Sequence, residues 1–180
     1  MLFGNFANIK IQRCKVSLLS KMIPVNSFGN VIGEVCRIIL PISEEIYYGN
    51  PNSDIAICTL SSIGLLKQIA NSNIFDRISI VGRLLSENKG IDQIILHLNK
   101  NKKIKKLIVC GKEVCGHKAG DSLYRLYQNG IDNNARIINS ISPDPFLTVS
   151  KSQIAYFQKE ITLINMINEI DLNKIKQKII

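Results

Sequence analysis

Short apolar runs alternate with amphipathic stretches from residue 54 onward, and this alternation constrains the fold more than any other feature. Residues 55–58, 78–81 and 107–110 are apolar and rich in isoleucine and valine, as buried strands are. Residues 63–70 and 91–99 carry apolar side chains at helical spacing. Strands that alternate with helices build a parallel sheet that is covered by helices on both faces. We therefore predict a single α/β domain with a mostly parallel sheet.

The C-terminal half continues this pattern. A helix is predicted over residues 121–129, and Gly130 is expected to end it. A further strand is predicted over residues 135–138. Ser150 and Gln153 form a capping-box pattern, so the last helix is expected to begin there. Apolar residues at helical spacing extend this expected helix to Ile164.

Three polar or glycine-bearing loops follow predicted strands, at residues 59–62, 82–88 and 111–120. In parallel sheets the carboxyl ends of the strands meet at one edge, and ligands bind among the loops there. We therefore expect the three loops to line one cleft.

Composition excludes several classes of protein. The apolar runs are far shorter than the about 20 residues that cross a bilayer, and the start of the chain does not resemble a secretory signal, so a cytoplasmic protein is expected. Five cysteines without a Cys-x-x-Cys pair argue against a disulfide framework. The net charge of +9 has two explanations. One is a general enrichment in surface lysine, and the other is an anionic partner that the lysine-rich residues 100–106 would contact.

The loop at residues 111–120 carries the most chemistry, with three glycines, Cys115 and His117. A neutral imidazole is a good ligand for a transition metal, and its second nitrogen needs a hydrogen-bond partner, for which Glu113 is the nearest candidate. Other interpretations are a surface histidine, a zinc site with Cys110 and Cys115, and a nucleophilic Cys115 with His117 as its base. The second histidine, His97, is expected to be structural. Phosphate-loop and dinucleotide patterns are missing from this loop.

The residues of this loop also carry a specific resemblance. The run Gly-Lys-Glu-Val-Cys-Gly-His-Lys-Ala-Gly-Asp-Ser-Leu at residues 111–123 resembles the cobamide-binding subunit of tetrahydromethanopterin S-methyltransferase. Further matches occur in the same order along the chain, at residues 48–51, 57–60, 86–91 and 127–132. The resemblance covers residues 46–168. The expected organisation is thus an N-terminal extension of unclear role at 1–45, a cobamide-binding domain at 46–168 and a polar C-terminal tail at 169–180.

The resemblance implies a Rossmann-like domain that binds a cobamide, a corrinoid with cobalt, with His117 as the lower axial ligand of the metal and the catalytic residue. More widespread corrinoid proteins have Asp-x-His-x-x-Gly, and this chain has Cys115 in place of that Asp. Polar and glycine residues at the strand ends are expected to surround the cofactor, namely Thr59, Ser61, Gly82, Glu87, Asn88, Gly111, Glu113, Gly116, Gly120 and Ser122.

The implied function is that of a methyltransferase component. The chain would carry a methyl group on cobalt between methyl-tetrahydromethanopterin, or a related donor, and a thiol such as coenzyme M. A separate pterin-binding methyltransferase subunit is the expected partner, and no nucleic acid is expected. Because residues 169–180 are polar, a soluble form without the C-terminal membrane helix of the family is expected. Two alternatives remain open: a basic nucleic-acid-binding module and a non-catalytic scaffold of the corrinoid family.

Overall fold

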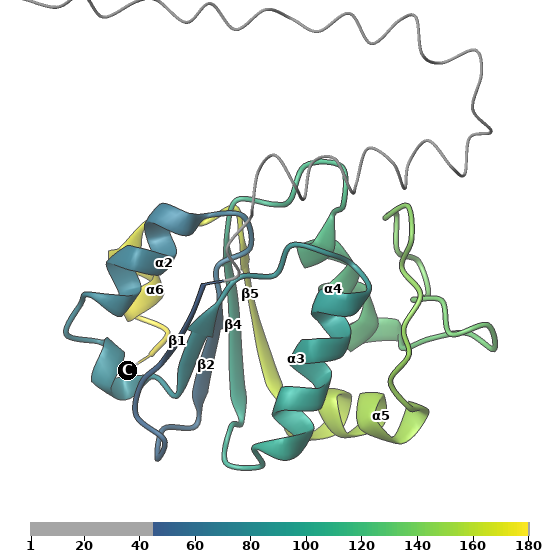
Figure 1. The fold of residues 1–180 in the computed structure, drawn as a ribbon, viewed down its shortest axis with the longest axis horizontal. Coiled ribbons are helices and arrows are strands. Elements are labelled where there is room, and N and C mark those ends of the chain that lie inside the picture. Colours follow the sequence, from purple (N-terminus) through teal and green to yellow (C-terminus); the bar gives the residue numbers. More distant parts are fainter. Residues whose placement is uncertain (1–44, 180) are drawn as a thin grey trace, which may run out of the picture. The chain divides into compact units, whose positions relative to one another are not determined.

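The computed structural model describes residues 45–179, which form a five-stranded sheet with helices on both faces (Figure 1). The strands are β1 (Ile46–Tyr48), β2 (Ile55–Cys58), β3 (Ile80–Gly82), β4 (Lys106–Gly111) and β5 (Thr162–Ile167). The helices are α2 (Ile63–Ala70), the 3-10 turn η2 (Phe75–Arg77), α3 (Lys89–Lys100), α4 (Ala119–Asn129), α5 (Lys151–Glu160) and α6 (Leu172–Lys176).

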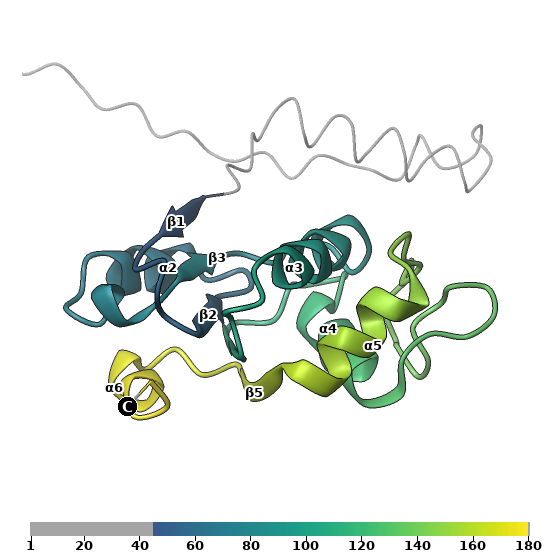
Figure 2. The same cartoon turned by 90° about the horizontal axis from the view of Figure 1, so that it is seen from below.

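The sheet has the order β1-β3-β2-β4-β5, and its only antiparallel pair among these strands is β1 with β3. Side chains alternate between two apolar layers. Ile57 and Ile108 face a cluster with α2 and α6, whereas Cys58 and Val109 face a cluster with α3, α4 and α5. Figure 2 shows the two groups of helices on opposite sides of the sheet. The predicted α/β fold with a mostly parallel sheet is confirmed.

The prediction of a strand over residues 135–138 was wrong. Only two isolated bridges form there, Ile131 with Ile137 and Arg136 with Phe146. Ala135 and Asn139 both have φ of 63°, so the backbone cannot stay extended across this stretch. The segment instead folds back on itself beyond α4.

The last predicted helix was too long. Ser150 and Gln153 do form the capping box, but the helix ends at Glu160. Residues 162–167 leave the helix and pair with β4 as the edge strand β5. The spacing of Ile161 and Ile164 fits a helix, but isoleucine, leucine and threonine at residues 161–164 also favour a strand, and pairing with β4 decides the outcome.

The C-terminal segment contains α6, which packs beside α2. Ile175 and Ile179 are buried in the same cluster as Leu66 and Ile69 of α2. Within residues 45–179, no helix is both long and apolar enough to cross a membrane. The domain boundaries stay a prediction, and the N-terminal extension lies outside the described residues.

We expect Ile175→Ala to lower the free energy of unfolding by about 2–4 kcal/mol, because it removes a fully buried side chain from a packed cluster. Urea unfolding followed by circular dichroism measures this change. Asn173→Ala, on an exposed position of the same helix, is the control and should change stability little. Equal unfolding curves for wild type and Ile175→Ala would show that α6 does not pack as described.

Candidate functional site

The three predicted loops lie together at the carboxyl edge of the sheet. The Thr59 amide donates to the Gly82 carbonyl at 2.9 Å, which joins the ends of β2 and β3. The Ser61 amide donates to the Lys112 carbonyl at 3.1 Å, which joins the ends of β2 and β4. The loops after β2, β3 and β4 therefore meet at one edge of the sheet, and the prediction that they line one cleft stays a prediction.

The His117 loop leaves β4 through Gly111, which the fold requires to be glycine. Its φ is 84°, and a Cβ there would lie 2.3 Å from the Thr59 carbonyl oxygen. Gly116 also has a positive φ, of 81°, but open space surrounds the position of its missing Cβ. The loop is therefore packed tightly at its start and open beside His117.

Glu113 caps the start of α4. Its carboxylate accepts hydrogen bonds from the amides of Val114 at 2.7 Å, Gly120 at 3.0 Å and Asp121 at 2.8 Å. These donors belong to the first turn of the helix or to the loop before it, where amides lack partners within the helix. The expectation that Glu113 is the partner of His117 was therefore wrong.

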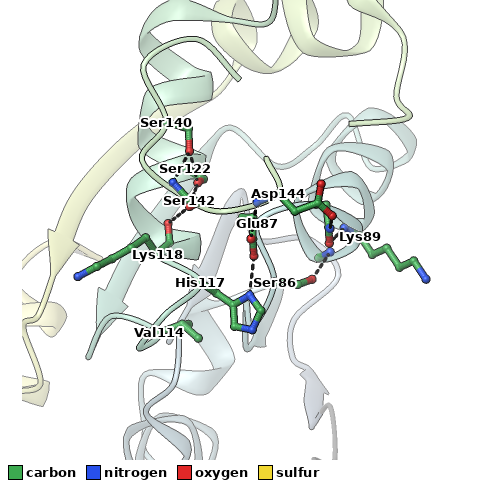
Figure 3. A network of polar contacts seen from close by, with 12 residues as sticks. Ser86, Glu87, Lys89, Val114, His117, Lys118, Ser122, Ser140, Ser142 and Asp144 are labelled. Atoms are coloured by element: carbon green, nitrogen blue, oxygen red, sulfur yellow. Dashed lines mark hydrogen bonds and ion pairs between the residues drawn. The ribbon is translucent and has the colours of Figure 1, made fainter. Parts of the chain in front are cut away.

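The partner of His117 is Glu87, in the loop between β3 and α3 (Figure 3). His117 Nδ1 lies 2.8 Å from Glu87 Oε2. The Glu87 residue is 1% exposed, whereas the His117 side chain is 56% exposed. Sequence reasoning placed Glu87 among the cofactor contacts and did not pair it with His117. No local sequence pattern connects two residues that are thirty positions apart.

This contact determines which nitrogen of His117 is available. In the neutral imidazole whose Nδ1 donates to this carboxylate, Nε2 keeps its lone pair. Among residues 45–179, nothing hydrogen-bonds to Nε2. An exposed imidazole with a carboxylate on one nitrogen and a free second nitrogen is the usual form of a metal-ligating histidine. Together with the open space beside Gly116, the residues present fit a bulky cofactor that offers a metal to Nε2 of His117.

The second oxygen of Glu87 fixes a segment that sequence reasoning did not connect with the site. Glu87 Oε1 accepts from the Asp144 amide at 3.1 Å, and Asn88 Nδ2 donates to Asp144 Oδ2 at 2.9 Å. Asp92 of α3 accepts from the amides of Thr148 and Val149 and from the Thr148 hydroxyl. Residues 144–149 are thereby held against α3.

Three buried serines hold the start of the same segment. The Ser122 hydroxyl contacts the hydroxyls of Ser140 and Ser142, and Ser142 donates to the Lys118 carbonyl at 3.1 Å. Lys118 follows His117 and has a left-handed φ of 50°. The segment at 140–149, which we call the clamp segment, is thus bound both to Glu87, the partner of His117, and to Lys118, the residue after His117.

The other predicted cofactor-binding residues all lie at the same edge. Several hold the backbone of the loops: Ser61 donates to the Lys112 carbonyl at 2.7 Å, and Asn88 caps α3 through the Lys89 amide. Thr59 and Ser122 are fully buried. A Cβ at Gly120 would lie 2.9 Å from Glu113 Oε2 and from Leu60 Cδ1, so a larger residue there would displace these two side chains. Contact of these residues with a cofactor stays a prediction.

Among the described residues, Cys58, Cys110 and Cys115 do not assemble a zinc site with His117. Cys110 is buried, and burial raises the pKa of its thiol far above the usual range, so the thiolate that zinc needs is disfavoured. Burial likewise raises the pKa of Cys58 to about 12. Cys115 is exposed in the loop. Across residues 45–179, no group of three histidine, cysteine or acidic side chains is placed to hold a metal ion.

The lysine-rich residues 100–106 lie at the opposite edge of the sheet, where β4 begins. Lys102 lies over the ring of Tyr156 at 3.3 Å, and Lys105 pairs with Glu160 at 3.3 Å. Both contacts are with α5, so these two lysines pack on the protein surface.

We expect Glu113→Ala to loosen the His117 loop, because three backbone donors lose their acceptor. The loss should lower stability by about 1–3 kcal/mol and speed amide hydrogen exchange at Gly120 and Asp121. Lys112→Ala, with an exposed side chain in the same loop, should leave both quantities unchanged. Unchanged exchange in Glu113→Ala would contradict the capping role.

Comparison with known proteins identifies the relatives of this chain. The MtrA family model, which describes one subunit of tetrahydromethanopterin S-methyltransferase, matches residues 39–180. The corresponding subunit of the putative methyltransferase Mtx of Methanosarcina acetivorans is 33% identical over 76% of this chain and 66% of the relative. The corresponding subunit of tetrahydromethanopterin S-methyltransferase from Methanothermobacter thermautotrophicus is 34% identical over 77% of this chain and 57% of the relative.

In Methanocaldococcus jannaschii, the corresponding subunit of the same methyltransferase is 33% identical over 77% of this chain and 56% of the relative. The chain therefore spans less than two thirds of the length of these relatives. Since the family model covers most of the residues, the chain belongs to the MtrA family of tetrahydromethanopterin S-methyltransferase subunits.

Proposed function

We propose that this chain binds a cobamide and that Nε2 of His117 is the lower axial ligand of its cobalt. The observation that carries the proposal is the His117–Glu87 contact, which engages Nδ1 of an exposed imidazole and leaves Nε2 without a hydrogen-bond partner among residues 45–179. The family relationship supports the same interpretation, since the family belongs to a methyltransferase and cobalt in a cobamide can accept and release a methyl group. When bound, the cobamide supplies a cobalt centre that accepts a methyl group from a methylated pterin and gives it to a thiol such as coenzyme M.

The residues of the chain orient and control this site. Glu87 is buried and holds the His117 ring in one orientation. The imidazole therefore loses little conformational entropy when it binds the metal. Gly116 keeps the space beside the ring open for a large planar cofactor. Gly111 and Glu113 fix the two ends of the loop, and His117 therefore moves on a short, anchored segment.

The same contacts couple His117 to the clamp segment. Glu87 accepts from His117 with one oxygen and from the Asp144 amide with the other. A displacement of the imidazole therefore changes the position of the carboxylate that holds residues 144–149. In this proposal the clamp segment reports to other subunits whether His117 is engaged.

The proposed partner is a pterin-binding methyltransferase subunit. The relatives are named as subunits of methyltransferases, so a partner that presents the methylated pterin belongs to the proposal. Cys58, Cys110 and Cys115 are free thiols. Free thiols support the proposal that the protein is located in a reducing compartment such as the cytoplasm.

We expect His117→Ala to fold normally, since its exposed side chain contributes little packing, but to bind cobamide about 10–100-fold more weakly. Its visible spectrum with bound cobamide should lack the shift that an axial nitrogen produces. Glu87→Gln should weaken binding about tenfold, because the amide fixes the imidazole tautomer less well than the carboxylate.

Titration of the apoprotein with cobamide, followed by absorbance, measures both effects. Cys115→Ala is the matched control from the same loop and should bind as wild type does. If His117→Ala and wild type gave the same spectrum and affinity, the proposed ligation would be wrong. If only Cys115→Ala lost binding, the thiol would be the functional group of the loop.

A further inference from the structure

The two edges of the sheet differ in how they are protected from pairing with another chain. β1 forms one edge and β5 forms the other (Figure 2). β1 has three residues, and a short edge strand offers few backbone groups to a neighbour. β5 has six residues, Thr-Leu-Ile-Asn-Met-Ile, without a charge or a proline. Charged side chains, prolines and short length commonly keep edge strands from pairing, and β5 has none of these features.

Every second residue of β5 directs its backbone groups away from the sheet. The Thr162 amide donates to the Lys105 carbonyl at 2.7 Å, and the Asn168 amide donates to the Gly111 carbonyl at 2.8 Å. Alternate residues of a strand bond to the same parallel neighbour. Even-numbered residues therefore face β4, whereas residues 163, 165 and 167 direct their amides and carbonyls outward.

Two of these three outward amides are open. Among residues 45–179, the amides of Leu163 and Asn165 have no acceptor. The Ile167 amide donates to Asn165 Oδ1 at 3.1 Å, and this acceptor belongs to an exposed side chain. The edge of β5 therefore keeps the backbone groups that a further strand needs.

The side chains of β5 are apolar on both faces of the sheet and are only partly buried. Leu163 and Ile167 pack on the side of α3, α4 and α5. Ile164 and Met166 pack on the side of α2 and α6. A further strand beside β5 would cover the exposed parts of these four side chains, and burial of apolar surface is favourable.

The sequence of β5 is complementary to itself in one antiparallel register. When Asn165 lies opposite Asn165 of a second copy, Leu163 lies opposite Ile167 and Ile164 lies opposite Met166. Opposite residues then share a face of the joined sheet, and the outward backbone groups of odd-numbered residues meet each other. In either neighbouring register, Asn165 would lie opposite an apolar residue, Leu163 or Ile167.

We propose that this protein forms a two-fold symmetric dimer in which β5 pairs antiparallel with β5 of a second copy, with the axis at Asn165. A two-fold interface uses the same surface of both copies, so a strand that matches itself favours a second copy over a different protein. The carboxyl edges of the two sheets point in opposite directions in this dimer. Each His117 loop therefore stays accessible at its own end.

Sedimentation velocity of the full chain over a range of concentrations measures the dimer. Wild type should sediment with the mass of two chains. Asn165→Lys should weaken the dimer at least about fivefold, because two like charges would lie directly opposite each other at the axis. Thr162→Lys is the matched control, since Thr162 is exposed on the same strand but lies away from the axis, and it should dimerise as wild type does.

A wild type that is monomeric at every concentration would leave the edge to a different protein and would overturn the proposal. A dimer that Asn165→Lys leaves unchanged would overturn it as well, because the copies would then associate through another surface. Circular dichroism of both lysine variants should match wild type, since both positions are exposed.

Disulfide cross-linking tests the register without a change in charge. Hydrogen-bonded residues opposite each other in an antiparallel pair have Cα atoms about 5.5 Å apart, within the range of a disulfide. Asn165→Cys should therefore give a covalent dimer on mild oxidation. Thr162→Cys should not, because the two copies of this position would lie about 20 Å apart along the strands.

Both cysteine variants carry serine in place of Cys14, Cys36 and Cys115. The native thiols that remain, Cys58 and Cys110, are buried. Cross-linking of the variant at position 165 alone supports the pairing. Cross-linking of both variants to the same extent, or of neither, would overturn it.

Discussion

The contact between His117 Nδ1 and Glu87 Oε2, 2.8 Å long, connects two loops that follow different strands of the sheet. Its geometry depends on the parallel arrangement of β3, β2 and β4, because only then do the loops after β3 and β4 end at the same edge. The contact fixes the orientation of the imidazole ring of His117, although the side chain is exposed. It also places a buried carboxylate where its second oxygen can hold the clamp segment.

The surrounding residues keep the His117 loop in the required shape by distinct means. Gly111 permits a left-handed backbone in contact with Thr59, and Glu113 provides acceptors for three amides at the start of α4. Ser122 anchors the clamp segment from inside the protein. These roles explain Gly111 and Glu113 without any reference to a ligand. The function of the site therefore depends on His117, Glu87 and the open space beside them.

Much of this arrangement could be predicted from the sequence, because it depends on local patterns. Ile55–Cys58 and its neighbouring strands follow from apolar runs, and the capping box at Ser150 follows from residue spacing. The Glu87 partner could not be predicted, since Glu113 is closer along the chain and only the folded loops show that backbone amides occupy it. Residues 135–138 were misassigned because apolar composition does not reveal the positive φ of Ala135 and Asn139. The role of Ser140, Ser142 and Asp144 depends on contacts with distant residues and has no sequence pattern.

Electron paramagnetic resonance of the Co(II) cobamide complex tests the ligation of cobalt most directly. Protein whose histidines carry ¹⁵N is combined with unlabelled cobamide, and the nitrogen hyperfine splitting of the cobalt signal is recorded. If His117 is the axial ligand, each line should split into a doublet, since ¹⁵N has nuclear spin one-half, and His117→Ala should remove this splitting. A triplet that is unchanged by the label and by His117→Ala would show that the cobamide's own base remains bound to cobalt, and it would contradict the account.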